Sequence, residues 1–484
     1  MMDKDKFDDI IIGAGYAGLS LAALLTKRSR KVLVLEAHSL VGGCASYYNR
    51  QQFHFDVGAT TLSGLAEGMP LKILINKLNL KSDYKKLDLP MKIKLPNGII
   101  LNRFADFDLW INELDQKFPN IDHRTFWNKL EKISTRAWGL LADTWSFPPQ
   151  NLSEVLNLLK PSLLKEADLG LYLLQPLKSI LPNEYKQGAL KSFIDEQLMI
   201  STQTTSEDVP ILMGALGLTY PNDMYYPNGG ISSLALSLKN FICENGGEVL
   251  LKSRVESISD DLVVSTKDHQ YKSDHVISTL PIWNLKELNP KLSDWVNSQA
   301  SAKGEYWSAI TANLAVKFKT PKTDLYHQLH LKEPLSAAKS HSLFISLSDP
   351  SDLTRAPEGW QTMTISTHAL PSDFPTQRNE VYKELKKQIL IEIKNHLSEY
   401  FDDIEETKFD TIGTPLTFVK YTSRFQGRVG GIPHSVNFMP WKWPKNVTPL
   451  TNFFHHGDTS FPGQGIVGVV QGSLNFMKRY HGEK

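Results

Sequence analysis

Cysteine is almost absent from this chain of 484 residues, which contains only Cys44 and Cys243. Two cysteines cannot build a disulfide framework, and neither has the spacing of a metal-ligand motif. The adjacent histidines His455 and His456 do not suggest a metal site either, because neighbouring residues on a strand point to opposite faces. We therefore expect no metal and a reducing, cytoplasmic environment.

Net charge is also almost absent, since 53 Lys and Arg residues are balanced by 52 Asp and Glu residues, a net charge of +1. This balance gives no general attraction to nucleic acid, so we expect no nucleic-acid partner. Apolar runs stay well short of the about 20 residues that a membrane-spanning helix needs. The charged N-terminal sequence MMDKDKFDD is not typical of a signal peptide, so any membrane contact is expected to be peripheral.

A strand–turn–helix–strand pattern occupies residues 8–36. The apolar run Ile10–Ile12 leads into a turn of Gly13, Ala14 and Gly15. A helical pattern follows, and a second apolar run stops at Glu36. Together these parts form the dinucleotide-binding βαβ pattern, which is far more specific than a glycine turn alone.

Each glycine of this pattern has a physical role. Gly13 allows a sharp turn out of the strand, Gly15 lets a pyrophosphate approach the backbone, and Gly18 lets the helix pack closely on the sheet. The free N–H groups at the helix N-terminus attract the pyrophosphate. Glu36 can accept hydrogen bonds from a ribose diol and disfavours a 2′-phosphate.

Two further glycine-rich segments suit a flavin dinucleotide. Gly42 and Gly43 follow the acid closely and permit a second close backbone approach. Near the C-terminus, Asp458 at a strand end can bind a ribityl hydroxyl, and the run from Gly463 to Gly465 lets the backbone pass beneath a flat ring. The helix that follows points its positive end at that ring, so both ends of the chain are predicted to meet on one FAD.

With these motifs the chain resembles the FAD-dependent carotenoid desaturase and isomerase family along nearly its whole length, and it looks most like the cyanobacterial-type carotenoid 3′,4′-desaturases. The resemblance is carried by GxGxxG at 13–18, Glu36, GG at 42–43, FDxG at 55–58, YPxGG at 226–230 and GDTSFPGQG at 457–465. The resemblance implies FAD as the cofactor. The implied cofactor-binding residues are Gly13, Ala14, Gly15, Gly18, Glu36, Gly42, Gly43, Cys44, Gly58, Val255, Gly457, Asp458, Gly465 and Ile466.

The predicted fold class is α/β, with a Rossmann-type FAD-binding domain that is discontinuous in sequence and a mixed sheet-plus-helix substrate domain. Residues 1–90, 220–290 and 413–484 are expected to form the FAD-binding domain. Residues 91–219 and 291–412 are expected to form the substrate- and membrane-facing domain.

The resemblance implies an oxidoreductase with an apolar tunnel to the flavin, in which a long polyene or isoprenoid is desaturated by hydride transfer to FAD. A carotenoid cis–trans isomerase or a saturase that uses reduced FAD is an alternative. Two others are a flavin amine oxidase, whose aromatic cage and lysine the sequence does not locate, and a non-enzymatic isoprenoid-binding protein on the same fold. The particular polyene, the electron acceptor and the oligomeric state stay open.

Three further assignments concern catalysis and the membrane. Arg424 is the candidate catalytic residue beside the flavin, against the competing interpretation of an ordinary ion pair. Cys44 is expected to be a small packed residue rather than a flavin attachment point. The leucine-rich stretch 152–181, together with Trp441 and Trp443, is predicted to dock on a bilayer, against the alternative that it packs on the protein's own core.

Overall fold

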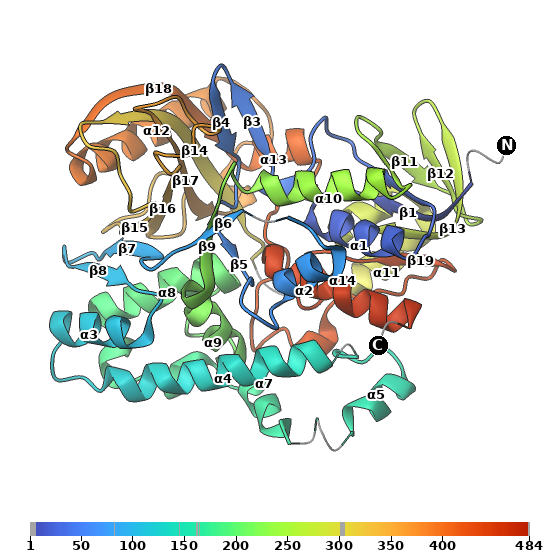
Figure 1. The fold of residues 1–484 in the computed structure, drawn as a ribbon, viewed down its shortest axis with the longest axis horizontal. Coiled ribbons are helices and arrows are strands. Elements are labelled where there is room, and N and C mark those ends of the chain that lie inside the picture. Colours follow the sequence, from blue (N-terminus) through green and yellow to red (C-terminus); the bar gives the residue numbers. More distant parts are fainter. Residues whose placement is uncertain are drawn as a thin grey trace.

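The computed structural model describes residues 6–81, 83–144, 146–160, 163, 165–300 and 305–482. Two large sheets lie next to each other in the upper part of the molecule, and a layer of helices lies below the second sheet (Figure 1). The α/β fold class predicted from the sequence is confirmed.

The first sheet contains the predicted βαβ unit. Strand β1 (Lys6–Ile12) pairs in parallel with β2 (Val32–Leu35), and α1 (Tyr16–Lys27) connects them. The strand order is β10-β2-β1-β13-β12-β11, with β19 paired to β13. The remaining strands are β10 (Glu248–Leu250), β11 (Val255–Ile258), β12 (Val263–Thr266), β13 (Gln270–Ser278) and β19 (Phe453–His455). The residues of β2 are buried on both faces, as is usual for a strand inside a parallel sheet covered by helices.

Helices cover the first sheet. Helix α1 packs against α10 (Ser232–Glu244) and α14 (Gly465–His481), while α2 (Pro70–Leu78) packs on α14. The C-terminal helix therefore lies directly beside the first helix of the chain, as Figure 1 shows.

The second sheet is mostly antiparallel and has the order β18-β14-β17-β16-β15-β7-β8. Its strands are β7 (Met91–Lys94), β8 (Ile100–Arg103), β14 (Ser308–Phe318), β15 (Tyr326–His330), β16 (Ser342–Leu347), β17 (Gln361–Ala369) and β18 (Ile404–Gly413). Helix α12 (Glu380–Tyr400) packs on this sheet and begins at Asn379, whose side chain accepts a hydrogen bond from the Tyr382 N–H.

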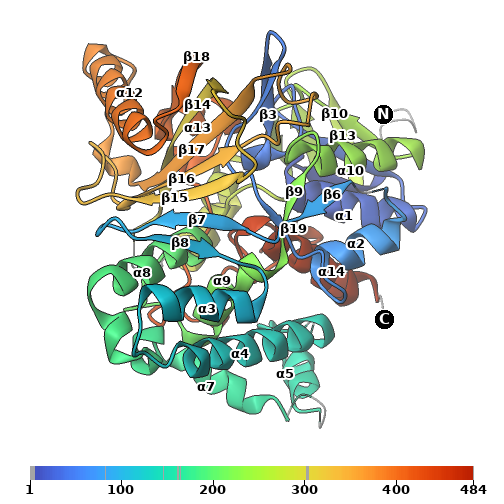
Figure 2. The same ribbon diagram turned by 60° about the vertical axis from the view of Figure 1, so that its left-hand side comes forward.

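Small sheets and a helical layer complete the fold. The hairpin of β3 (Tyr47–Arg50) and β4 (Phe53–Asp56) and the sheet of β5 (Leu62–Ser63), β9 (Met224–Pro227) and β6 (Tyr84–Lys86) connect the two large sheets. The helical layer, seen from the side in Figure 2, lies under β7 and β8. It contains α3 (Phe107–Lys117), α4 (His123–Asp143), α5 (Leu152–Leu158), α7 (Leu171–Leu174), α8 (Gly188–Thr202) and α9 (Ile211–Thr219).

The strands divide between the sheets by sequence. The first sheet takes its strands from residues 6–35, 248–278 and 453–455, and the second takes its strands from 91–103 and 308–413. We therefore propose the same division into a discontinuous cofactor domain and a second domain that the sequence suggests. The boundaries themselves stay a prediction.

The stretch 152–181 does not form the continuous amphipathic helix that its leucine pattern favours. Helix α5 ends at Leu158, and short helical turns follow from Ala167 to Ile180. Pro161, Ser162 and Leu164 lie outside the described residues. The strand β18 was also not expected, because seven of its ten residues are polar or glycine and several are exposed.

The packing of α1 on β1 generates a stability prediction. A Cβ at Gly18 would lie 2.0 Å from the carbonyl oxygen of Gly13, so Gly18→Ala should lower the free energy of unfolding by about 3 kcal/mol. Gly139→Ala, on α4, is the matched control, because its Cβ meets no atom within 4 Å and alanine favours a helix by up to about 1 kcal/mol. Thermal unfolding of both variants is the measurement. Equal midpoints for the two variants would contradict the packing role of Gly18.

Candidate active site

A cavity of about 1930 Å³ lies where the two sheets and the helical layer meet. It is lined by the glycine turns of the N-terminal segment, by the C-terminal glycine-rich segment and by residues of α4 and α9. Pockets for single small ligands measure about 300–1,000 Å³. This cavity is therefore large enough for a cofactor and a second, extended ligand.

The N-terminal wall is formed by two glycine turns that face each other. Gly15 and Gly42 form an isolated parallel bridge, and the Gly42 N–H donates to the carbonyl oxygen of Ala14. A Cβ at Gly43 would lie 3.2 Å from the Gly15 Cα, whereas a Cβ at Gly15 would meet only Gly43 Cα, at 3.9 Å. The two turns are thus in backbone contact with each other, and they line the cavity without side chains at the N-terminus of α1, which suits a pyrophosphate.

Glu36 stands at the end of β2 and lines the cavity. One carboxylate oxygen accepts the Ala14 N–H at 2.7 Å, and the other accepts the His38 N–H at 2.8 Å. Because each carboxylate oxygen has two lone pairs, Glu36 can still accept a ribose hydroxyl. Val255, at the start of β11, lines the same part of the cavity.

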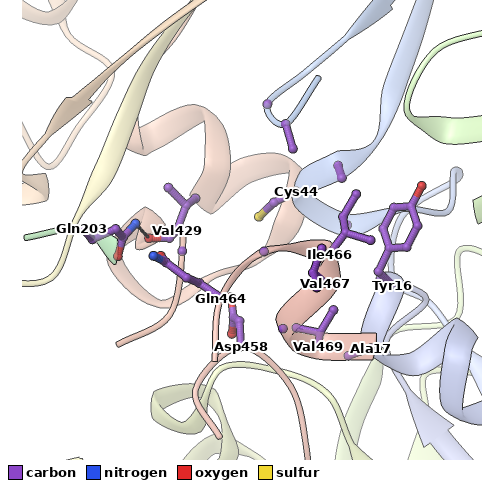
Figure 3. Close-up of a pocket in the computed structure, with 18 of the residues that line it drawn as sticks. Tyr16, Ala17, Cys44, Gln203, Val429, Asp458, Gln464, Ile466, Val467 and Val469 are labelled. Atoms are coloured by element: carbon purple, nitrogen blue, oxygen red, sulfur yellow. Dashed lines mark hydrogen bonds between the residues drawn. The ribbon is translucent and has the colours of Figure 1, made fainter. Parts of the chain in front are cut away.

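The C-terminal segment forms the opposite wall. Figure 3 shows Asp458 and Gln464 of this segment on the side away from Tyr16 of α1, whereas Ile466 lies toward Tyr16. The Asp458 Oδ1 atom is buried and has no hydrogen-bond partner among the described residues. Gly465 has a φ of +77°, and a Cβ there would meet no atom within 4 Å. The N-terminus of α14 therefore has uncovered backbone at Gly465, and the segment just before it carries an unpaired acceptor on Asp458.

Arg424 is partly buried beside these residues and pairs with Asp458 at 2.5 Å. Its Nε also donates to the Arg428 carbonyl oxygen. Burial lowers the pKa of Arg424, but the Asp458 carboxylate and Cys44 more than offset this, so the pKa is raised. Burial raises the pKa of the Cys44 thiol in spite of Arg424. Arg424 therefore holds Asp458 in place, and its role as a catalytic residue stays a prediction.

Twelve of the fifteen predicted site residues line the cavity. These are Gly13, Gly15, Glu36, Gly42, Gly43, Cys44, Gly58, Val255, Arg424, Asp458, Gly465 and Ile466. Ala14, Gly18 and Gly457 shape its walls from behind. Ala14 bonds to Glu36, Gly18 packs on Gly13, and the Gly457 N–H donates to Ser460 Oγ.

Gln203 was not found from the sequence. It follows α8 with a φ of +58°, and its side chain donates to the Val429 carbonyl oxygen at 3.0 Å (Figure 3). Its Oε1 atom is buried without a partner among the residues described. A Cβ at Gly430 would lie 1.8 Å from Gln203 Nε2, so the paired glycines 430–431 were the available signal.

The helical end of the cavity is largely apolar. Its lining residues on α4, α9 and the segment after α5 include Trp138, Leu141, Leu158, Leu169, Leu173, Leu212, Met213 and Leu216. Burial lowers the pKa of His434, which also lines the cavity, to about 4. His434 is therefore neutral at physiological pH.

The prediction that Trp443 docks on a bilayer is wrong. Trp443 is only 3% exposed, stacks on His434 with ring centroids 5.1 Å apart and packs against Phe461. Trp441 is 52% exposed. The pattern PWKWP could not separate them, since the Gly463 backbone and Phe461, which cover Trp443, come from a distant part of the sequence.

No group of three or more His, Cys, Asp or Glu side chains among the described residues could hold a metal ion. Within the same residues, no helix has the length and apolar character needed to cross a bilayer.

The residues fit FAD at three separate points. The glycine turns at Gly15 and Gly43 let a pyrophosphate approach the backbone, Glu36 retains acceptor capacity for a ribose, and the unpaired Asp458 Oδ1 can accept a ribityl hydroxyl. The N-terminus of α14, with its partial positive charge, lies beside Asp458.

Comparison with known proteins agrees with this geometry. The sequence model of the family described as flavin-containing amine oxidoreductase matches residues 16–428. A prolycopene isomerase from an Oncidium hybrid cultivar is 26% identical, covering 97% of this chain and 82% of the relative. An all-trans-retinol 13,14-reductase from Danio rerio is 23% identical over 97% of this chain and 85% of its own length.

A solved oxidoreductase from Methanosarcina mazei shares the fold, with a TM-score of 0.64 and 18% identity over 98% of this chain and 100% of that chain. These findings confirm the predicted FAD cofactor and the predicted resemblance to carotenoid-family flavoproteins.

The side-chain-free turn at Gly15 generates a prediction about the cofactor. Gly15 has a φ of −74°, so Gly15→Val is compatible with the backbone, but its side chain would occupy cavity space beside Gly43. We expect at least a tenfold fall in bound flavin per protein, measured by visible absorbance, with an unchanged circular dichroism spectrum. Gly139→Val adds the same side chain to the α4 wall and should keep its flavin. Full flavin content in Gly15→Val would contradict the assigned pyrophosphate site.

Proposed function

Because the chain belongs to the flavin-containing amine oxidoreductase family and is an FAD-dependent oxidoreductase, we propose that its substrate is a long apolar polyene. The observation that carries this proposal is the cavity of about 1930 Å³, which continues from the FAD site between α4 and α9 along a largely apolar wall. Two groups of relatives, named prolycopene isomerases and retinol reductases, act on substrates of this kind and cover 96–97% of the chain.

The direction of the reaction is the second part of the proposal. The sequence predicts desaturation, which stays a prediction. The named isomerases and reductases among the relatives favour the alternative, in which reduced FAD isomerises or saturates the polyene. We propose this second direction.

FAD supplies a hydride acceptor or donor at the ring when it is bound. The residues of the chain bind and orient the cofactor and the polyene and exclude water from the site. The α14 N-terminus and Asp458 hold the ring end of the cofactor, with Asp458 itself fixed by Arg424. The apolar side chains of α4 and α9 bind the polyene and exclude water. Gln203 is the nearest candidate for an orienting amide, since its Oε1 atom is unpaired among the described residues.

A flavin amine oxidase is less well supported. The sequence did not locate the lysine that such an enzyme usually places near the flavin. Among the described residues, the lysine that lines the cavity is Lys386, which lies over the Tyr382 ring on α12, 5.6 Å from its centroid. It therefore belongs to the second sheet's helix rather than to the glycine-rich segments.

An anaerobic comparison of the two flavin redox states tests the direction. Prolycopene is mixed with oxidised enzyme and with dithionite-reduced enzyme, and the pigments are separated by chromatography. We expect all-trans product only with the reduced enzyme, which stays reduced. The flavin-free Gly15→Val variant is the control and should give no product. Bleaching of the oxidised flavin by substrate, with a product two hydrogens poorer, would support desaturation instead.

The bilayer is the proposed source of the substrate. Leucines around α5 and α7 are exposed, namely Leu152, Leu156, Leu159, Leu171 and Leu174, with exposed fractions of 50–76%. Their neighbours Leu158, Leu169 and Leu173 line the cavity, so the exposed patch borders its apolar end. Trp441 lines a small surface pocket together with Pro148, Pro149 and Gln150, which precede α5. Lys160 and Lys165 are exposed nearby and can contact lipid headgroups.

A liposome sedimentation assay tests this docking surface. Changing Leu152, Leu156 and Leu159 to serine should lower the pelleted fraction at least threefold, because it removes exposed apolar area. The control carries Leu353→Ser and Val381→Ser, which are 64% and 67% exposed elsewhere on the molecule. Equal sedimentation of the two variants would refute the docking surface.

A further inference from the structure

The cavity changes character along α4. Toward the C-terminal end of this helix its wall is Trp138 and Leu141, whereas one and two turns earlier it is Glu131, Ser134 and Thr135. The facing chain changes in the same way. Leu212 and Leu216 of α9 give way to a polar run at the end of α9 and the turn after it, formed by Thr219, Tyr220, Asn222 and Asp223. An apolar channel therefore ends in a polar pocket.

Behind this pocket lies a fully buried cation. Arg103, at the end of β8, is 2% exposed and lies over the rings of Trp110 and Trp127, 4.7 and 5.4 Å from their centroids. It donates to Asn222 Oδ1 at 2.6 Å, and Asn222 Nδ2 donates to Glu131 Oε1 at 2.8 Å. Burial lowers the pKa of Arg103 to about 9, against the opposing effects of Glu131 and Tyr220. The positively charged Arg103 and the negatively charged Glu131 are thus linked by two hydrogen bonds through the side-chain amide of Asn222.

Polar atoms on Glu131, Tyr220 and Asp223 are left for a ligand in this pocket. Within the part of the chain that the structure describes, Asn222 is the hydrogen-bond partner of the Glu131 carboxylate, which leaves Oε2 available. The Tyr220 hydroxyl is buried without a partner among the same residues. A buried hydroxyl without a partner costs about 1–3 kcal/mol, which a ligand atom would recover.

The neighbouring polar side chains are only partly satisfied. Asp223 Oδ2 accepts the N–H groups of Gly64, Leu65 and Ala66 at 2.8–3.1 Å, so it fixes the loop after β5, but Asp223 Oδ1 is buried without a partner among the described residues. The Thr219 hydroxyl donates to Ser134 Oγ. Acceptors on Glu131 and Asp223 and the donor on Tyr220 are therefore available to a ligand.

We propose that this pocket binds the hydroxyl end of a substrate whose remainder is the apolar polyene, an inference that rests on the proposed function. An alcohol donates one hydrogen bond and accepts another, which matches Glu131 Oε2 and the Tyr220 hydroxyl. A carboxylate end is repelled by Glu131, which lines the pocket, whereas Arg103 lies behind it. A hydrocarbon end leaves these polar atoms unpaired.

Three ligands with one polyene chain test the pocket. All-trans-retinol, its hydrocarbon analogue without the hydroxyl, and all-trans-retinoic acid are titrated into the oxidised holoenzyme in the dark without oxygen. Binding is followed by quenching of tryptophan fluorescence, since Trp138 lines the channel. We expect the alcohol to bind at least tenfold more tightly than either of the other two.

Variants then separate head-group recognition from a structural effect. Glu131→Ala should weaken retinol binding about tenfold and leave the hydrocarbon unchanged, and Glu131→Gln should restore part of the loss, because it keeps an acceptor. Tyr220→Phe should weaken retinol binding with no loss of thermal stability, because its hydroxyl has no partner among the described residues. Lys129→Ala, at an exposed position of α4 outside the pocket lining, is the matched control and should change none of the three affinities.

Equal affinity for the alcohol and the hydrocarbon, or variants that weaken all three ligands alike, would overturn the hydroxyl pocket while leaving the polyene proposal standing. Failure of all three ligands to bind would overturn both. Tightest binding of the acid would contradict the charge argument.

Discussion

The site depends on close backbone–backbone contacts at three glycines, where a side chain would not fit. A Cβ at Gly18 would fall 2.0 Å from the Gly13 carbonyl oxygen, one at Gly58 would fall 2.5 Å from the Cys44 carbonyl oxygen, and one at Gly431 would fall 2.0 Å from the Asp458 carbonyl oxygen. Through these three contacts α1 packs closely on β1, the segment after β4 packs on the second glycine turn, and the segment after Arg424 packs on the C-terminal segment. Residues more than 400 positions apart in the sequence thereby line one cavity.

The second sheet is held to this arrangement by a buried ion pair. Asp56 and Arg355 are 2% and 5% exposed and lie 3.0 Å apart, and the Asp56 carbonyl oxygen also accepts Asn313 Nδ2 of β14. Loss of one partner of such a pair typically costs about 3–5 kcal/mol. The FDxG motif therefore serves two purposes, since Asp56 contacts the second sheet while Gly58 leaves room for the Cys44 carbonyl oxygen. With the two units fixed, the helical layer extends the cavity from the cofactor site into an apolar channel.

Much of the cofactor site could be predicted because its determinants are local. The turn from Gly13 to Gly18, the acid at Glu36 and the helix after Gly465 each carry their own spacing signal, and the structure brings them to one cavity. The rest depends on tertiary contacts between distant segments. Gln203 gains its role from Val429, Trp443 is covered by Phe461, and Glu131 acquires its setting from Arg103 through Asn222. None of these partners lies within a window of sequence in which periodicity could reveal it.

The central claim is that the first turn of the chain and its last helix bind one FAD together. Hydrogen–deuterium exchange of the protein with FAD bound and after its removal measures this directly, peptide by peptide. The account predicts that FAD slows exchange at residues 13–20 and at residues 464–470 together, at one cofactor per chain, with α12 little changed. Protection of only one of the two segments, or of neither, would contradict it.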